Sequence, residues 1–388
     1  MSKRRIETEV IHGGAMPMIL DSVTMPIFQS STFAMHKESS YHDLKYIRLN
    51  NTPNQTVLAK RIALLEDGEA AVVTASGMAA ISAVLLSTLR SGDHALALKG
   101  LYGGTHTFFS DELPGLGIEV DFVDGNDPKE WAKKIKDNTK VFYAESITNP
   151  LLEVVDLEAI TKFSRDRDLV SIIDNTFATP VFFKPLSIGF DVVVHSCTKY
   201  LNGHNDIVAG AIIANQELVQ NSTAMLNHLG GSLDPHACFL LERGMKTLPL
   251  RLRQQSHNAL ALATFLEEQP QITKVHYPGL PTHPAHERAA RLFGGFGGVL
   301  SFEIEGGAQV ADELLDEVSI PTLAPSLGGV ETLIVRPAAS SHLGMSAEDR
   351  RAMGITDGLI RVALGIEATD DLLEDFAQAL SKRGSVAA

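Results

Sequence analysis

Few cysteines and a shortage of positive charge set the first limits on this chain of 388 residues. Two cysteines, Cys197 and Cys238, are too few for a disulfide framework, and their apolar neighbours indicate buried side chains. With 33 basic and 47 acidic residues the formal net charge is −14, which argues against nucleic acid or an anionic membrane as the main partner. An anionic ligand would need a local positive site.

Membrane, export and metal signals are also lacking. No apolar run approaches the roughly 20 residues that cross a bilayer. The basic residues 3–5 are not followed by an apolar segment, so no secretory signal is indicated. His204, His283 and His286 have no cysteine or carboxylate partners at metal spacing, so we expect no metal site. We therefore expect a cytoplasmic protein.

Strand and helix patterns alternate from about residue 54 to residue 214. This order predicts a mainly parallel sheet covered by helices on both faces, in an α/β domain over residues 51–248. A helical stretch broken at Pro249 follows, and residues 249–388 are expected to form a smaller α+β domain. Residues 1–50 lack clean periodicity and are interpreted as an arm that contacts a neighbouring subunit.

Local signals support several of these helices. Asp127, Pro128 and Glu130 predict the start of a helix through residue 136, with Asp127 as the cap and Glu130 completing a capping box. Residues 70–74 and 79–89 predict a strand and a helix, joined by a turn at Gly77. The N–H groups at such a helix start can bind an anion.

The sequence around Lys199 indicates that this lysine acts as a nucleophile. The β-branched run 192–194 predicts a buried strand, and Ser196, Thr198 and Lys199 follow it. Shielding from water favours the neutral amine of a lysine, which can form a Schiff base with a carbonyl compound. The two hydroxyls can hold a phosphate group.

An acidic residue follows the preceding predicted strand. Residues 169–174 end in Asp174, and ligands of open parallel sheets bind outside the strand carboxyl ends, so Asp174 and Lys199 are expected to face one crevice. A carboxylate and an amine there match pyridoxal phosphate (PLP): the amine binds the aldehyde and the acid keeps the pyridine nitrogen protonated. A surface lysine and an aspartate that begins a turn with Asn175 remain the plain alternative.

The same segment also fits a competing motif. Ser196 and Lys199 have the Ser-x-x-Lys spacing of serine acyl-enzymes, which begins a helix and is accompanied by Ser-Asp-Asn and Lys-Thr-Gly. The chain contains neither tripeptide, and its motif follows a predicted strand. These points argue against an acyl-enzyme.

Together the motifs resemble the γ-subfamily of PLP enzymes for sulfur amino acids, which includes cystathionine γ-lyase, cystathionine γ-synthase, methionine γ-lyase and homoserine-ester sulfhydrylases. The resemblance runs nearly end to end and depends on residues 76–78, 101–105, 174–177, 196–204, 326–329 and 359–362. It implies PLP as cofactor, fold type I of the PLP-dependent transferases (the aspartate-aminotransferase type), and a homotetramer of two active dimers.

The resemblance also implies roles for matching positions. Lys199 resembles the Schiff-base lysine, Asp174 the partner of the pyridine nitrogen, and Tyr102 the residue stacked on the ring. Residues expected to bind the phosphate are Ser76, Gly77, Met78, Ser196 and Thr198, with Tyr46 and Arg48 reaching it from the neighbouring subunit. Residues expected to bind the substrate carboxylate are Asn149, Ser326 and Arg361.

One stretch and three single positions depart from the family pattern. The usual Asn-Pro-Thr after Tyr-x-Arg is altered at residues 51–54, and the usual His-Pro-Ala begins with Arg336. Methionine γ-lyases typically carry Cys at Gly104, and cystathionine γ-lyases typically carry Glu at Val335. These changes keep open a non-sulfur leaving group, such as the guanidinooxy group of canavanine.

The implied activity is γ-elimination from an amino acid with a heteroatom at Cγ, of the cystathionine, methionine or homocysteine type. Lys199 would remove the Cα proton, and a proton would then leave Cβ, which lets the heteroatom on Cγ depart. Tyr102 is a candidate acid for that leaving group, and hydrolysis would give ammonia and 2-oxobutyrate. The close alternative is γ-replacement, in which a thiol reacts with an O-acylhomoserine. A protein that binds PLP with little catalysis is a further alternative.

Overall fold

The computed structural model describes residues 4–14, 18–35, 44–340, 343 and 347–384, and the described chain forms two compact units. Unit 1 comprises the chain up to Leu98, Gly104–Glu145 and Leu157–Pro249. Unit 2 comprises Lys99–Gly103, Ser146–Asp156 and the chain from Leu250 onward. Two short segments from the middle of the chain thus belong with its C-terminal part.

Unit 1 contains a seven-stranded sheet in the order β1-β7-β6-β5-β4-β2-β3. Only β7 runs against its neighbours in it, so the sheet is mainly parallel, as the sequence predicted. The strands are β1 (Ala70–Thr74), β2 (His94–Leu98), β3 (Glu119–Val123), β4 (Thr139–Glu145), β5 (Val170–Asp174), β6 (Val192–His195) and β7 (Gly210–Ala214). All residues of β2, β6 and β7 are buried, as expected for strands covered on both faces.

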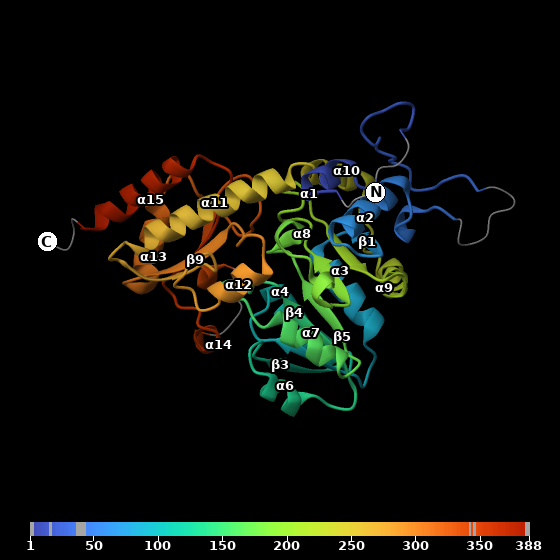
Figure 1. The fold of residues 1–388 in the computed structure, drawn as a ribbon, viewed down its shortest axis with the longest axis horizontal. Coiled ribbons are helices and arrows are strands. Elements are labelled where there is room, and N and C mark those ends of the chain that lie inside the picture. The colour runs from blue at the N-terminus through green and yellow to red at the C-terminus, as the bar shows by residue number, and fades with distance from the viewer. Residues whose placement is uncertain (1–3, 15–17, 36–43, 341–342, 344–346, 385–388) are drawn as a thin grey trace. The chain divides into compact units, whose positions relative to one another are not determined.

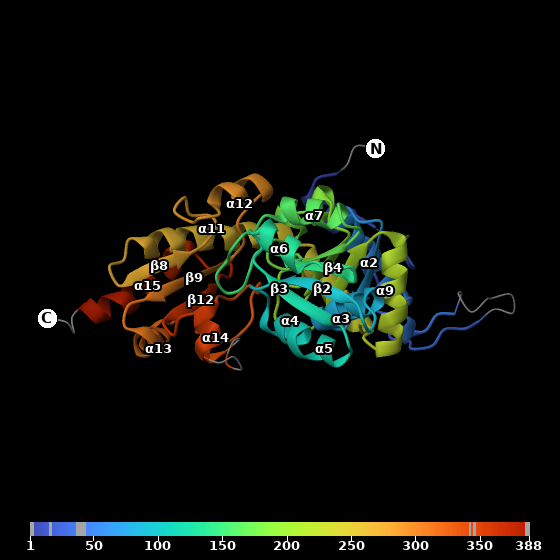
Figure 2. The same cartoon turned by 90° about the horizontal axis from the view of Figure 1, so that it is seen from below.

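Helices precede, connect and follow these strands along the chain. They are α1 (Ile6–His12), η2 (Ile47–Leu49), α2 (Pro53–Leu65), α3 (Gly77–Thr88), α4 (Gly103–Thr107), η3 (Phe108–Glu112), α5 (Leu113–Gly115), α6 (Pro128–Lys134), α7 (Leu157–Arg165), α8 (Thr179–Phe182), η4 (Pro185–Ile188), α9 (Gln216–Leu229) and α10 (Pro235–Met245). Helices α3 and α9 pack against each other (Figures 1 and 2). The altered turn at residues 51–54 starts α2, with Thr52 as the cap and Pro53 in the first turn.

The N-terminal arm contacts its own chain where it is described. Helix α1 packs on α2, Val10 is buried, and Arg61 donates a hydrogen bond to the Ile11 carbonyl at 3.1 Å. Farther along, the side chains of Met18, Leu20 and Val23 are exposed. Residues 1–3, 15–17 and 36–43 of the predicted arm lie outside the described residues.

Unit 2 contains a five-stranded sheet in the order β10-β11-β12-β9-β8, in which only the β10–β11 pair is parallel. The strands are β8 (Ile272–His276), β9 (Val299–Ile304), β10 (Thr322–Leu323), β11 (Leu333–Val335) and β12 (Leu359–Ala363). The helices are α11 (Leu248–Glu267), α12 (His286–Leu292), α13 (Gly307–Glu317), η5 (Pro337–Ala339), α14 (Ala347–Ala352) and α15 (Thr369–Gly384). Helices α10 and α11 are separated by Lys246 and Thr247, next to the predicted break at Pro249.

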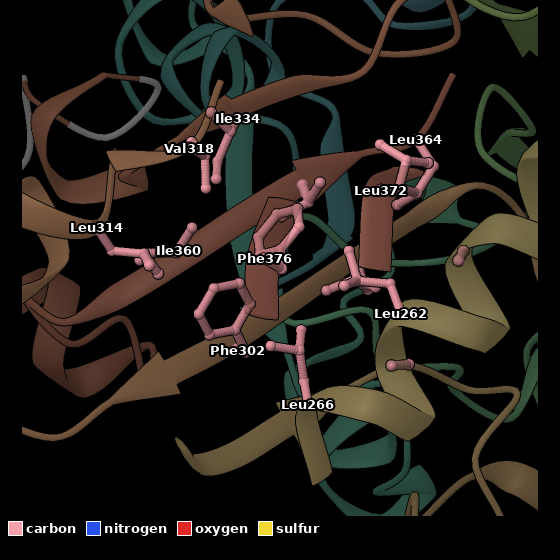
Figure 3. Close-up of a cluster of buried hydrophobic side chains, with 14 of the residues drawn as sticks. Leu262, Leu266, Phe302, Leu314, Val318, Ile334, Ile360, Leu364, Leu372 and Phe376 are labelled. Atoms are coloured by element: carbon pink, nitrogen blue, oxygen red, sulfur yellow. The ribbon is translucent and has the colours of Figure 1, made fainter. Parts of the chain in front are cut away.

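One face of the unit 2 sheet carries the hydrophobic core of that unit. Helices α11, α13 and α15 supply side chains to it, and Ile360 and Val362 of β12 point into it. Phe302 and Phe376 pack edge to face, with ring centroids 6.5 Å apart (Figure 3). Because successive strand residues point to opposite faces, Arg361 lies on the face away from this core.

Among the residues the structure describes, no helix is both long and apolar enough to span a membrane.

Candidate active site

The carboxyl ends of β5 and β6 carry the predicted cofactor residues. The two strands pair in parallel, with Asp174 opposite Val194, so Asp174 and the segment after His195 lie at one sheet edge. Residues 197–202 form a turn there, in which the Lys199 N–H donates to the Ser196 carbonyl at 3.1 Å. Lys199 is half-buried. The structure thus puts Asp174 and the turn that contains Lys199 at neighbouring strand ends.

Asp174 lies in a shielded position and is linked to the β6 end through Thr176. Its Oδ1 accepts a hydrogen bond from the Thr176 N–H at 2.9 Å, and the Thr176 hydroxyl accepts one from the Ser196 N–H at 2.8 Å. Burial raises the pKa of the Asp174 carboxyl, with Thr176 and His195 acting in the opposite direction. Sequence reasoning gave Thr176 no role, although it lies in the matched stretch 174–177.

The start of α3 meets the segment after β6. Ser76 caps α3, since its hydroxyl accepts a hydrogen bond from the Ala79 N–H at 3.0 Å. A Cβ atom at Gly77 would lie 2.8 Å from Ser196 Cβ, so only glycine allows this approach. Gly210 is also required, because a Cβ there would lie 2.3 Å from the Ser76 carbonyl oxygen. These contacts place Ser76, Gly77 and Ser196 together.

Thr198 is held by the segment that leads into β7. Its hydroxyl accepts a hydrogen bond from the Ala209 N–H at 3.0 Å and donates one to the Ala209 carbonyl at 3.2 Å. Ser196 and Lys199 lie in a coil and a turn after a strand, not at a helix start. This local structure does not match the acyl-enzyme motif.

The residues of unit 1 fit PLP in their chemistry. The first N–H groups of α3 have no partner within the helix, and the helix dipole favours a negative charge there, as a phosphate carries. A pyridinium nitrogen would stabilise the ionised form of Asp174, which burial disfavours. Lys199 would supply the amine for the aldehyde. A helix start suited to an anion, an acid and an amine therefore occur together at the carboxyl ends of β5 and β6.

Tyr46 and Arg48 lie around η2. The Arg48 guanidinium donates a hydrogen bond to the Asn227 carbonyl of α9 at 3.0 Å and lies 5.7 Å from the centre of the Tyr46 ring. Arg48 is exposed. Their predicted contact with the phosphate of a neighbouring subunit stays a prediction.

In unit 2, Arg361 is buried and oriented by two hydrogen bonds. Its Nη1 donates to Asn149 Oδ1 at 3.0 Å, and its Nη2 donates to the Ser326 carbonyl at 2.9 Å. Ser326 has a φ of 150°, an uncommon backbone conformation for a residue other than glycine. All three residues predicted to bind the substrate carboxylate thus lie together, with Ser326 acting through its backbone.

Ser301 extends this group but was not predicted. It pairs with Arg361 across β9 and β12, and its hydroxyl donates to the Pro150 carbonyl at 2.7 Å. The bond holds the residue after Asn149. A lone serine within an apolar strand gives a signal for such a contact, but not for its partner.

Two further positions have contacts that bear on their roles. Arg336 donates to both carboxylate oxygens of Asp312, through Nε at 2.8 Å and Nη2 at 2.9 Å. This ion pair gives Arg336 a structural partner on α13. The Tyr102 side chain is 46% exposed, in a segment that belongs to unit 2, and its stacking on the cofactor ring stays a prediction.

Cysteine and metal chemistry receive no support. Cys197 and Cys238 are both buried, and burial raises the pKa of each thiol, so both stay protonated at neutral pH. Within residues 4–14, 18–35, 44–340, 343 and 347–384, no group of three His, Cys, Asp or Glu side chains is arranged to hold a metal ion.

Comparison with known proteins extends over nearly the whole chain. The family model for Cys/Met metabolism PLP-dependent enzymes matches residues 7–381. L-methionine gamma-lyase of Fusobacterium nucleatum subsp. polymorphum is 42% identical, over 98% of this chain and 99% of the relative. Cystathionine gamma-lyase of Bacillus subtilis is 43% identical, over 96% and 98%. The solved structure of cystathionine gamma synthase from Xanthomonas oryzae pv. oryzae, in complex with aminoacrylate and cysteine, has a TM-score of 0.94 at 37% identity and covers 98% of this chain and 99% of that chain.

Proposed function

Since the chain belongs to the family of Cys/Met metabolism PLP-dependent enzymes, with the type I fold of that family, we propose that it catalyses γ-elimination from an L-amino acid with a heteroatom at Cγ. The observation that carries the proposal is the pairing of β5 and β6. It puts Asp174 and the turn with Lys199 at adjacent strand ends, beside the start of α3.

Bound PLP supplies an electron sink for the bond broken at the substrate Cα. The Lys199 Nζ would bind the cofactor aldehyde and then, once freed by the substrate amine, remove the Cα proton. Asp174 would hold the proton of the pyridine nitrogen. A second proton would then leave Cβ, so that the electron pair left there breaks the bond between Cγ and the heteroatom. Tyr102 is the candidate acid that donates a proton to the departing heteroatom.

Arg361 is assigned to the substrate carboxylate, because its planar guanidinium is buried and fixed by Asn149 and the Ser326 carbonyl. We predict that Arg361→Lys raises KM for the amino acid by about 10- to 100-fold, since one or two charge-assisted hydrogen bonds are lost. Steady-state kinetics measure this, with PLP content unchanged. Arg336→Lys is the matched control: its ion pair is to Asp312, so its KM should stay within about threefold of wild type.

Elimination and replacement diverge after the same early steps, so an assay must separate them. We expect 2-oxobutyrate and ammonia to form from substrate alone, with no added thiol. The panel comprises cystathionine, methionine, homocysteine, O-acylhomoserines and canavanine, with 2-oxobutyrate, homoserine and pyruvate as readouts. Turnover only of an acylhomoserine together with cysteine would instead assign γ-replacement, and pyruvate from cystathionine would place the elimination at Cβ.

A local contact bears on the leaving group. Val335 is buried and pairs with Arg361 across β11 and β12, so both side chains lie on the same sheet face. An apolar side chain beside the carboxylate site favours a leaving group without a charge. In the panel, methionine or homocysteine is therefore expected to exceed cystathionine and canavanine in kcat/KM.

Assembly into a homotetramer and a cytoplasmic location remain part of the proposal. The exposed Met18, Leu20 and Val23 of the N-terminal arm support a contact with a second subunit, because apolar side chains gathered on an exposed segment commonly mark an interface. Sedimentation of the holoenzyme measures the assembly.

A further inference from the structure

Behind the cofactor residues lies a buried polar cluster formed by Glu66, Asn175 and His195. The exposed fractions of these residues are 0%, 0% and 1%. Glu66 follows α2, whereas Asn175 and His195 come from the ends of β5 and β6. Two donors converge on one carboxylate oxygen, Glu66 Oε1: Asn175 Nδ2 at 2.9 Å and His195 Nε2 at 2.6 Å.

This cluster is expected to contribute little to the free energy of unfolding. Burying a carboxylate takes it out of water, and a well-packed apolar group of the same size often stabilises a protein equally well or better. Glu66 Oε2, His195 Nδ1 and Asn175 Oδ1 lie buried without a hydrogen-bond partner among the described residues, so the polar groups are not even fully satisfied. The cluster is therefore expected to contribute through the position that it gives to the ends of β5 and β6.

The position of the cluster is specific. Asn175 is the residue after Asp174, and His195 is the residue before Ser196. The Asn175 N–H donates to the Val194 carbonyl at 3.0 Å, which continues the β5–β6 pairing to this end. Because neighbouring strand residues point to opposite sides, Glu66 contacts the strand ends from the side away from Asp174.

We infer that Glu66 is a positioning residue, which joins the ends of β5 and β6 through Asn175 and His195 and thereby fixes Asp174 relative to Ser196 and Lys199 for PLP. The inference depends on the proposed roles of Asp174 and Lys199. One carboxylate that accepts from both strands sets their relative position more tightly than backbone pairing alone. Thr176 makes a second link on the cofactor side, from Asp174 to Ser196.

The test is PLP affinity, measured by absorbance when PLP is added to protein stripped of it, together with the thermal unfolding of the stripped protein. Glu66→Ala removes both hydrogen bonds, and we expect the Kd for PLP to rise by about 10- to 100-fold. Glu66→Gln keeps an oxygen acceptor for both donors, so its Kd is expected within about threefold of wild type. Borohydride trapping should show less PLP on Lys199 in Glu66→Ala at limiting PLP.

Glu242→Gln is the matched control. Glu242 is also a buried carboxylate of unit 1, but it lies 3.4 Å from Arg61 and 3.9 Å from Lys246. It is expected to change the unfolding temperature without changing the Kd for PLP. A Glu66→Ala protein with wild-type affinity, or with a loss no larger than that of Glu242→Gln, would overturn the inference.

Two further outcomes are interpreted separately. If Glu66→Ala is not recovered folded, Asn175→Ala and His195→Ala each remove one of the two links and replace it in the test, and wild-type affinity in both would overturn the inference. Wild-type protein that takes up no PLP at all would overturn the proposed roles of Asp174 and Lys199 themselves. The two failures are therefore distinguishable.

Discussion

Lys199→Ala is expected to lower kcat by about 10⁴-fold, the upper end of what one proton-transferring group contributes. The change removes both the amine that binds the cofactor aldehyde and the base at the substrate Cα. Borohydride treatment of wild-type protein with PLP should add the mass of one reduced cofactor on Lys199, and the variant should show no such gain. Activity is measured as 2-oxobutyrate release.

Lys184→Ala is the control for this change. Lys184 belongs to the same unit but forms an ion pair with Asp67 at 3.1 Å, so its loss should leave activity within about twofold. Added alkylamines should restore part of the activity of Lys199→Ala, because a free base can enter the vacated space. A Lys199→Ala protein with wild-type turnover would mean that the function is not Schiff-base chemistry.

Asp174→Asn is expected to lower kcat/KM by about 10²–10³-fold, since a preorganised charge beside the cofactor nitrogen is lost. The same change should stabilise the PLP-free protein at neutral pH. Burial raises the pKa of the Asp174 carboxyl in the folded state, so the ionised form is disfavoured by folding. Asparagine removes that cost.

The gain in stability of Asp174→Asn is expected to depend on pH. The stability advantage of Asp174→Asn without PLP should be largest above the raised pKa of the folded state. It should vanish as the pH falls below the ordinary value of 3.8, where the wild-type carboxyl is protonated in both states. Thermal unfolding from pH 3 to pH 8 measures it.

Asp191→Asn serves as the matched variant. The Asp191 carboxylate accepts hydrogen bonds from the Ser171 N–H at 2.8 Å and the Ser171 hydroxyl at 2.7 Å, just before β6 begins. It should lose stability and keep PLP-dependent activity. If Asp174→Asn turned over substrate at the wild-type rate, the assignment of Asp174 to the pyridine nitrogen would be wrong.

The parts of the fold with local signals were predictable from sequence. Asp127 caps α6 as predicted, accepting hydrogen bonds from the N–H groups of Lys129 and Glu130. Glu130, however, accepts from the Asp124 N–H, because a nearby loop competes for its carboxylate. Local pattern thus located the helix start but not every partner of its side chains.

Elements with weak patterns were missed. Strand β3 lies at the edge of its sheet and is only partly buried, so it lacks the apolar run that marked its neighbours. Helix α9 is rich in polar residues. Its Asn215 cap and Gly230, at φ 78°, are the signals that could have located it.

Residues of the predicted site could be grouped from the sequence only where they share a strand end or a motif. Asp174 and Lys199 were grouped because parallel strands end at one edge. The cluster of Glu66, Asn175 and His195 was not predicted. Glu66 lies 109 residues before Asn175 and 129 residues before His195 in the sequence, and no periodicity links them. Contacts of that kind are set by tertiary packing.

Unit 2 is built from separate segments of the chain, and this has a consequence for folding during translation. Arg361 and Asn149 lie 212 residues apart, and Arg288 reaches back to the Val154 carbonyl in the same early segment. At roughly 5–20 residues per second, a ribosome needs about 10–40 s to supply the later partner. During translation, segment 146–156 is therefore made before its partners in unit 2 exist. A fragment that begins at residue 250 would lack this segment and its contacts with Arg361 and Arg288.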